Sequence, residues 1–328
     1  MRELPFALAG LGLVALAGIL RAGPLDPPAG SVSPSYKTLA QVEPRTPIPG
    51  GTFAAAYVIT QPGSYYLTDN IRLGSGGSAI FVQASNVTID LNGFSIISES
   101  AAADTAIDVF EFNVPAAGIT IRNGSIRGNF SQGSLRLHYA QGVLVENVRI
   151  SDNPDMAFSL GVSTTANNCT ASGCKFGFWG AGATLTNCTV TGTPLDGSAF
   201  VLTRSVARHC EAIDNVGTGF ELQGNSLIEF CTARDNALSG GTRSNVLLKG
   251  SGNRVDSCTI SGGFSAMYIT SGSTDNLVMR NTFRRGSSWG IIQASQSEGS
   301  YPGNHVAQVI ANPASPFTAT NPMANIEY

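Results

Sequence analysis

Short stretches in which apolar and polar residues alternate recur along most of the chain, separated by turns rich in Gly, Asn, Asp and Ser. Strict alternation over a few residues is the pattern of a β-strand, and those turn residues favour tight reversals of the backbone. No stretch after the first 22 residues shows the 3.6-residue period of a helix. The pattern therefore predicts many short strands and an all-β protein.

Two kinds of strand phrase alternate at a regular interval. One kind is LTNCTVTG at 185–192, ARHCEAID at 207–214, IEFCTARD at 228–235 and VDSCTISG at 255–262, and the other includes SAFVLTR and TGFELQG. Aligning the first kind gives one column whose members are 19 to 31 residues apart: Gly93, Gly124, Val148, Cys169, Cys188, Cys210, Cys231, Cys258 and Asn281. Such a period indicates a solenoid, in which each repeat is one coil stacked on the next. The Leu pattern and the helical half of a leucine-rich repeat are both missing.

Three further motifs carry a resemblance to a known family. They are ITQPGSYYLT at 59–68, DLNGF at 90–94 and NPMAN at 321–325. With these motifs and the repeat, the chain resembles the right-handed parallel β-helix, or pectin-lyase-like, proteins, of the secreted bacterial type, over about residues 40–328. The resemblance implies a single right-handed parallel β-helix of about nine to ten coils. It is specific for architecture and says little about chemistry.

The two ends of the chain differ from the repeat. Residues 1–22 contain an apolar run followed by small residues, which predicts a signal peptide and a secreted, periplasmic or cell-surface protein. An uncleaved membrane anchor is the alternative, and no later segment is apolar enough to span a membrane. Residues 23–52 are rich in Pro and predict an extended arm, 53–305 the β-helix, and 306–328 a C-terminal cap.

Composition excludes one class of partner. Charged residues make up 12% of the chain, about half the usual share, and the formal net charge is −3. The Lys and Arg residues are scattered, so the chain lacks the basic stripe that nucleic-acid binding needs. A polysaccharide or cell-surface glycan remains the expected partner.

The cysteines are expected to be part of the core. Their column alternates with apolar residues and holds Gly or Val in other coils, so the thiols should point inward as a ladder of small side chains. Stacked parallel strands hold side chains farther apart than the about 3.8 Å between β-carbons that a disulfide prefers. Cys174 lies off the ladder, and a disulfide between Cys174 and Cys169 remains an alternative. No CxxC motif or nearby His predicts a metal site.

The second kind of strand phrase presents the residues that could bind a ligand. With its apolar residues turned inward, two outward columns remain, an assignment that depends on the register because a one-residue slip exchanges the two faces. One column includes Phe81, Asp108, Arg136, Glu221 and Tyr268, and the other includes Phe110, His138, Trp179, Gln223 and Lys249. We expect these side chains to lie in a long, shallow groove.

The residue types in these columns suit a polysaccharide. Aromatic rings can stack on the apolar faces of sugars, although exposed aromatic residues are also ordinary strand formers. A basic residue such as Arg136 or Lys249 can neutralise a uronate carboxylate while His138 accepts the neighbouring proton, which is the chemistry of a lyase. For a hydrolase, Glu221 and Asp235 are the nearest approach to a pair of carboxylates. The Asp-Asn pairs that recur at one turn are explained by turn formation alone.

The resemblance leaves both the activity and the cofactor open. Pectate lyases of this fold bind calcium through clustered acidic residues, and polygalacturonases carry a set of close aspartates. This chain shows neither pattern, so none of its residues is assigned a catalytic role by comparison with these enzymes. For the same reason, no residue is assigned as a ligand of calcium. We carry two hypotheses: a polysaccharide-binding protein that cleaves by elimination through Arg136, His138, Glu221 and Lys249, and a non-catalytic structural or adhesive repeat protein. A metal-handling role ranks third, because Met, His and Cys clusters are missing.

Overall fold

The computed structural model describes residues 43–74, 76–100, 103–109, 116–194, 196–238 and 243–284, and the backbone of the strands at 289–293, 305–307, 310–311 and 326–327. The chain divides into two units, residues 1–44 and 45–328. The expected signal peptide, most of the expected arm and Phe110 lie outside the described residues. The described residues of the second unit form strands and turns. Its described part contains no helix long and apolar enough to cross a membrane.

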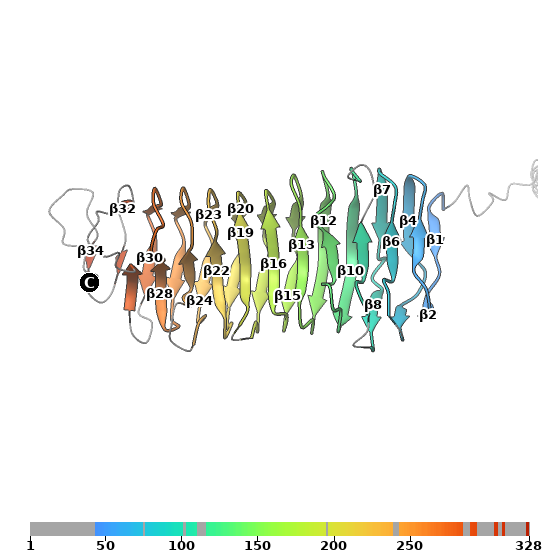
Figure 1. Cartoon of the computed structure of the whole chain (residues 1–328), viewed down its shortest axis with the longest axis horizontal. Helices are drawn as coiled ribbons and strands as arrows, with labels where there is room; N and C mark the ends of the chain where they lie inside the picture. The colour runs from blue at the N-terminus through green and yellow to red at the C-terminus, as the bar shows by residue number, and fades with distance from the viewer. Residues whose placement is uncertain are drawn as a thin grey trace, which may run out of the picture. The chain divides into compact units, whose positions relative to one another are not determined.

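The strands of the second unit form two parallel sheets, as Figure 1 shows. Every coil contributes one strand to the 11-stranded sheet B, and each strand pairs in parallel with the strand one coil away. The strands of sheet B are β3 (Tyr57–Ile59), β6 (Ile80–Val82), β9 (Ile107–Val109), β11 (Leu135–Leu137), β13 (Met156–Leu160), β16 (Phe176–Ala181), β19 (Ser198–Thr203), β22 (Thr218–Leu222), β25 (Val246–Leu248), β28 (Ser265–Ile269) and β31 (Trp289–Gln293). This stacking confirms the predicted all-β parallel β-helix.

The 23-stranded sheet A is bent along its length into two rows of strands. The first row is β1 (Thr46–Ile48), β4 (Gly63–Leu67), β7 (Val87–Asp90), β10 (Thr120–Gly128), β12 (Leu144–Ser151), β14 (Thr165–Asn167), β17 (Thr184–Thr186), β20 (Val206–Arg208), β23 (Leu227–Glu229), β26 (Arg254–Asp256), β29 (Leu277–Met279) and β32 (His305–Ala307). The second row is β2 (Gly51–Phe53), β5 (Ile71–Leu73), β8 (Ser95–Ser98), β15 (Thr170–Ser172), β18 (Thr189–Thr191), β21 (Glu211–Ile213), β24 (Thr232–Arg234), β27 (Thr259–Ser261), β30 (Thr282–Arg284), β33 (Ile310–Ala311) and β34 (Ile326–Glu327). Strands β10 and β12 run through the bend and belong to both rows.

A single residue in the left-handed conformation makes the bend between the two rows in most coils. These residues have φ between 52° and 60°, and they are Asn123, Asn147, Asn168, Asn187, His209, Phe230, Ser257 and Arg280. Asparagine tolerates this conformation better than most residues, because its short side chain can bond to the local backbone. The bend follows directly from the Asn that precedes the Cys position in several repeats.

Aromatic residues stack through the middle of the core. The rings of Phe158, Phe178, Phe200 and Phe220 are fully buried on neighbouring strands of sheet B. Their centroids are 4.3, 5.3 and 4.6 Å apart in sequence order, and the ring planes lie within 8° of parallel. The spacing matches the distance of about 4.8 Å between neighbouring strands, so each coil packs its ring on the coil before it.

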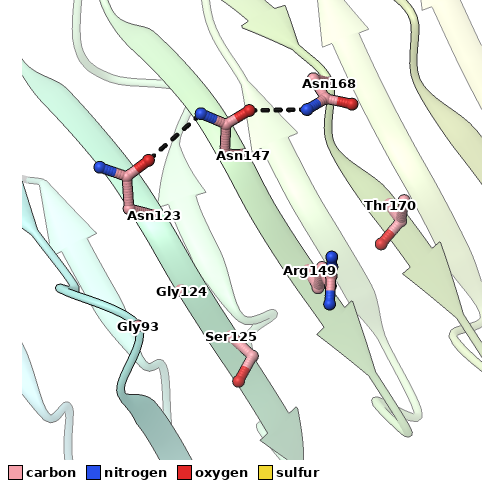
Figure 2. A pocket seen from close by; sticks show the side chains of 8 residues that line it. All are labelled: Gly93, Asn123, Gly124, Ser125, Asn147, Arg149, Asn168 and Thr170. Carbon is pink, nitrogen blue, oxygen red and sulfur yellow. Dashed lines mark hydrogen bonds between the residues drawn. The ribbon is translucent and has the colours of Figure 1, made fainter.

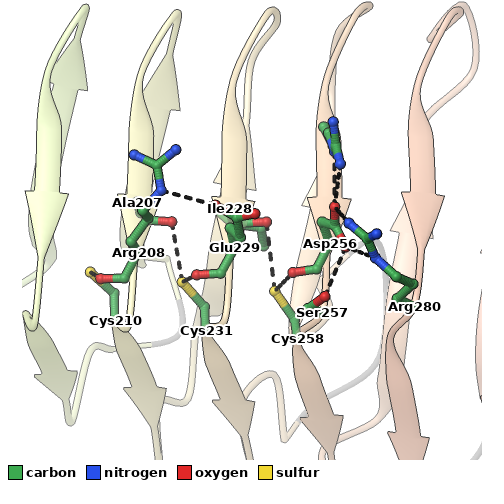
Figure 3. Close-up of polar contacts among 11 residues, drawn as sticks. Ala207, Arg208, Cys210, Ile228, Glu229, Cys231, Asp256, Ser257, Cys258 and Arg280 are labelled. Carbon is green, nitrogen blue, oxygen red and sulfur yellow. Dashed lines mark hydrogen bonds and ion pairs between the residues drawn. The ribbon is translucent and has the colours of Figure 1, made fainter.

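The cysteine ladder lies inside the bend, as predicted. Cys169, Cys188, Cys210, Cys231 and Cys258 are buried on successive coils, and Figure 3 shows three of them in a row. Each Sγ donates to a backbone carbonyl, such as that of Ala207 for Cys231 at 3.4 Å. All six thiols are free, including Cys174, which is buried off the ladder and donates to the carbonyl of Ser172. The open alternative of a disulfide between Cys169 and Cys174 is not realised.

Strands that pair with the β-helix lie beyond both of its expected boundaries. Strand β1 pairs with β4 at Thr46↔Tyr65, so the sheet starts inside the range expected to be an arm. At the other end, β32 and β33 pair with β29 and β30, and β34 pairs with β33, all within or next to the expected cap. Proline at position 47 and irregular spacing after 305 hid these strands, since Pro is tolerated at a sheet edge but weakens the sequence pattern.

Candidate functional site

The outward side of sheet B carries almost all of the candidate residues. The paired residues of its central column, from the N-terminal coil onward, are Phe81, Asp108, Arg136, Ser159, Trp179, Val201, Glu221, Leu247 and Tyr268. The column beside it contains Gln83, His138, Thr203, Gln223, Lys249 and Thr270. We call the surface formed by these two columns the sheet B face.

Trp179 stands in the other column from the one predicted. It pairs with Ser159 and Val201 and therefore belongs to the central column. Gly177 points to the core, since a β-carbon there would lie 2.6 Å from the Val190 side chain. In β16 two consecutive residues, Gly177 and Phe178, both face inward. A strictly alternating pattern cannot register such a pair.

At the N-terminal end of the face, Arg136 is bound to a buried carboxylate. Asp108 on β9 is only 3% exposed, and Arg136 on β11 donates to it from Nε at 2.9 Å and from a second nitrogen. A third nitrogen of the guanidinium donates to Gln132. Since a guanidinium has five N–H groups, two remain for a ligand. The Asp108 bond raises the pKa of Arg136, so the group stays charged.

His138 lies on the solvent side of this ion pair. Its Nδ1 is 3.0 Å from the hydroxyl of Ser159 on the next coil, which leaves Nε2 toward solvent. The ring of Tyr139 contacts the imidazole with a centroid distance of 3.9 Å, and Tyr139 is 52% exposed. Partial burial, and then the charge of Arg136, lower the pKa of His138 below its usual value of 6.5. His138 is therefore neutral at pH 7 and able to accept a proton.

An aromatic pair occupies the middle of the face. The rings of Trp179 and Phe176 on β16 meet edge to face at 5.1 Å, and Lys175 lies over the Phe176 ring at 5.7 Å. Both rings are half-buried. The indole stands two coils from Arg136 and two coils from Glu221, or roughly 10 Å from each at the spacing of neighbouring strands.

The C-terminal half of the face holds a second satisfied carboxylate. Glu221 on β22 accepts hydrogen bonds from Ser198 Oγ, Gln223 Nε2 and Lys249 Nζ, each at 2.9 Å. Burial works to raise the pKa of Glu221, but the bonds from Lys249 and the neighbouring groups outweigh it, and the pKa is lowered. The carboxylate is therefore ionised and paired at neutral pH.

The expectation that all four proposed catalytic residues are exposed is wrong for one of them. Arg136, His138 and Lys249 reach solvent, but Glu221 is only 7% exposed. Asp235 follows β24 in sheet A and pairs with Arg234 at 3.4 Å, so it is not among the partners of Glu221. Of the other predicted binding residues, Phe81, Gln223 and Tyr268 are half-buried on the face and Asp108 is buried.

Several residues with polar or aromatic side chains at these clusters were not predicted. Tyr139, Phe176 and Ser198 lie at turns or strand ends, where the period-2 pattern gives no direction for a side chain. The described residues contain no group of three or more His, Cys, Asp or Glu that could hold a metal. On the outside of sheet A, a pocket of about 400 Å³ lies beside the bend, lined by asparagines and Arg149, and Figure 2 shows its side chains. The alternation of apolar and polar residues does not predict that pocket.

The chain is similar to known proteins both in its sequence pattern and in its fold. The chain matches the family described as "Right handed beta helix region" over residues 57–205 and 177–309. A comparison with curated proteins gives no match.

Similar solved structures share the fold at low sequence identity. The A-module of mannuronan C-5 epimerase AlgE6 of Azotobacter vinelandii has a TM-score of 0.54 and 14% identity, covering 82% of this chain and 91% of its own. A GH87 alpha-1,3-glucanase catalytic domain in complex with tetrasaccharides has a TM-score of 0.52 and 9% identity, covering 80% and 64%. The tailspike protein of E. coli bacteriophage HK620, in complex with a pentasaccharide, has a TM-score of 0.50 and 11% identity, covering 80% and 60%.

Proposed function

The chain belongs to the right-handed β-helix family, and from this premise we propose that it is an exported protein whose sheet B face binds a polysaccharide. The observation that carries this proposal is the order of groups on the face. A half-buried cation beside a neutral histidine, an aromatic pair two coils further on and a second cation three coils beyond that pair follow one another along the face. A polymer of sugar rings lying along the stack could meet all three together.

Each group has a matching contact on an acidic polysaccharide. The indole of Trp179 offers an apolar ring to the C–H face of a sugar. The free N–H groups of Arg136 and the ammonium of Lys249 can donate to uronate carboxylates. The epimerase among the similar structures is named for mannuronan, and the glucanase and the tailspike were solved with oligosaccharides, which supports this choice of ligand.

The N-terminal cluster also supports cleavage by elimination. Arg136 would neutralise the uronate carboxylate, which acidifies the neighbouring C–H. Nε2 of His138 accepts that proton while the C–H electrons form a carbon–carbon double bond and the glycosidic C–O bond breaks. The departing oxygen takes a proton from the hydroxyl of Tyr139, beside the histidine. No oxidant, reductant or metal is needed for this balance.

One observation favours the non-catalytic alternative. Both cations of the sheet B face are already paired with buried carboxylates, Arg136 with Asp108 and Lys249 with Glu221. Pairs of this kind can have a purely structural role, which is to hold neighbouring coils in register. A structural or adhesive repeat protein would need no more.

Incubating the full chain with neutral and uronic-acid polysaccharides separates the two functions. Elimination produces unsaturated ends that absorb in the ultraviolet, and we expect them from uronic-acid polymers only. His138→Ala should reduce the rate by at least about 100-fold, in line with the usual contribution of a general base. Trp179→Ala should weaken binding with a smaller effect on the rate of the bound polymer. If the chain binds the polymer without forming product, and His138→Ala binds it equally well, the non-catalytic function is the correct one.

The pH dependence gives a second readout for the same residue. Since the base must be neutral, the rate should be constant around pH 7 and fall as the pH drops through the lowered pKa of His138. Arg136→Gln removes a positive neighbour, so the acid limb should move to higher pH. If the acid limb of the pH–rate profile lies at the same pH in Arg136→Gln as in the wild type, the titrating group is a residue other than His138.

A further inference from the structure

The pocket on sheet A lies on a different sheet of the coil from the chemistry considered so far, and it is built from two rows of polar side chains. Its lining is Gly93, Asn123, Gly124, Ser125, Asn147, Arg149, Asn168 and Thr170. The three asparagines form the bend residues of consecutive coils, and Ser125, Arg149 and Thr170 form the next row, in register with one another. Figure 2 shows the two rows running side by side across the strands.

The asparagine row is a chain of linked amides. Asn168 Nδ2 donates to Asn147 Oδ1 at 2.7 Å, and Asn147 Nδ2 donates to Asn123 Oδ1 at 3.2 Å. Asn123 Nδ2 in turn donates to Asp90 at 3.3 Å. Each amide uses one of its two N–H groups in this chain, so each keeps one donor and a lone pair. The left-handed backbone and the amide links hold these groups in place before a ligand arrives.

Arg149 supplies a positive charge without a counter-ion. Its side chain is exposed, and in the described part of the chain no carboxylate forms an ion pair with it. Its neighbour Arg122 differs, because Arg122 donates to the buried Asp90 at 3.1 Å. Glu146 stands on the other side of the bend, in register with Arg122, and does not line the pocket.

A longer turn in the preceding coil forms one wall. Four residues, 91–94, connect Asp90 to Ser95, whereas two residues connect the equivalent positions Arg122 and Ser125 in the next coil. Gly93 in this turn has a φ of 82°, and a β-carbon there would meet nothing within 4 Å. The hollow beside the turn is therefore open enough for a ring-sized ligand.

We propose that this pocket binds an acidic sugar residue, with its carboxylate on Arg149 and its hydroxyls on the asparagine amides. A guanidinium matches a carboxylate by two parallel hydrogen bonds, and a carboxamide can donate to one hydroxyl while it accepts from another. Ser125 and Thr170 on either side of Arg149 add further hydroxyl partners. The site uses no residue of the sheet B face, so it is a second, separate place at which the chain holds an acidic glycan.

Calorimetry with uronic-acid tetrasaccharides, using the full chain, tests the site. Arg149→Ala should lower the affinity of this site by about tenfold or more, and Arg149→Lys, which keeps the charge but loses the paired geometry, by less. Arg204→Ala is the matched control, because Arg204 is an exposed turn arginine that does not line the pocket. Arg204→Ala should bind the uronic-acid tetrasaccharide with the affinity of the wild type.

Asn147→Gly gives an independent variant that keeps the fold. Glycine accepts the φ of 54° at this position, so only the amide is lost, and affinity should fall several-fold. A neutral tetrasaccharide should bind at least about tenfold more weakly than the acidic one. Equal affinity in Arg149→Ala and wild type, or displacement of the sugar by sodium acetate at the same carboxylate concentration, would overturn the proposal.

Variants of the other face keep the two proposals distinguishable. His138→Ala and Trp179→Ala should leave the Arg149-dependent binding unchanged. If the sheet B face binds nothing, the wild type will show one site, which Arg149→Ala weakens and Trp179→Ala leaves unchanged. If both faces bind, the wild type will show two sites, and Arg149→Ala will weaken one of them and Trp179→Ala the other.

Discussion

One backbone conformation, repeated in most coils, decides which side chains stand along the bend of sheet A. Asparagine fills that position from Asn123 to Asn187, as the left-handed conformation favours. His209 and Phe230 replace it in the next two coils, although a bulky residue is strained there, and their rings stack at 5.5 Å. The row thus changes from linked amides to stacked rings without any change in the backbone.

A buried carboxylate lies just beyond those rings. Asp256 on β26 is fully buried and accepts from Arg280 Nε at 2.8 Å, from Arg254 Nε at 3.1 Å and from Ser257 Oγ at 2.9 Å. Figure 3 shows Arg280 and Ser257 turned toward it. Burial alone would raise the pKa of Asp256, but these bonds outweigh it and lower the pKa to about 2.

The lowered pKa makes the stability of the chain depend on acid. A carboxyl whose pKa is lower in the folded state stabilises the fold above its usual pKa of 3.8 and loses this effect as the pH falls toward 2. Asp256→Asn should therefore reduce the free energy of unfolding by roughly 2 kcal/mol at pH 7, and by almost nothing at pH 2. Denaturant titrations at both pH values measure this difference.

Asp235→Asn is the matched control for this measurement. Asp235 pairs with Arg234 at the surface, and both side chains are about half exposed. Exposed pairs contribute little, so the change should stay within about 0.5 kcal/mol at either pH. A loss in Asp256→Asn that is the same at pH 2 and pH 7 would contradict the linkage.

At the scale of single elements, the two sheets of a coil have different tasks. The first-row strands of sheet A are mostly three residues long and meet the second row at a fixed bend, with the cysteines inside it. Sheet B strands run up to six residues and place phenylalanines inward and the candidate residues outward. Short strands with one inward apolar residue suffice because the coils on both sides cover it.

The packing of these elements predicts how the thiols react. All six cysteines are buried, and burial raises the pKa of Cys174 to about 11. A thiol-specific reagent should modify almost none of them in the native chain and all six after unfolding in denaturant without reductant. Four reactive thiols after unfolding would instead reveal a disulfide, and rapid labelling of the native chain would show that the ladder opens.

At the scale of the whole unit, each coil depends only on its neighbours. Equivalent residues of successive coils pair at the same positions, as Thr170 pairs with Thr189 and Thr189 with Glu211. Deleting residues 189–210 removes one coil and brings Glu211 directly after Cys188, opposite Thr170. The shortened chain keeps the alternation of inward and outward residues throughout.

Such a deletion should leave a folded β-helix. We expect a strand-type circular dichroism spectrum and a cooperative thermal transition, at a temperature somewhat below that of the full chain because fewer interfaces remain. Deleting residues 189–209 is the control, since it shifts the following strand by one residue and turns its inward side chains outward. Equal transitions for both deletions would show that register does not govern the stack.

The sequence alone determined the architecture of this protein. The alternation within each phrase, the period of the cysteine column and the turn residues define strands, coils and inward side chains, because each depends on residues that are close in the chain. On the same grounds the ladder of Cys188 and Cys210, and the outward direction of Arg136 and His138, could be predicted. These features are local, and repetition makes them unambiguous.

Which side chains meet between coils could be seen only in the folded chain. The pairs of Asp108 with Arg136 and of Glu221 with Lys249, the column of Trp179, and the pocket around Arg149 all join residues of different coils. Their positions depend on coil length and on bends that break the alternation, such as the four-residue turn at 91–94. A difference of one or two residues in a turn leaves the strand pattern unchanged but moves every contact across the coils, so the pattern could not reveal them.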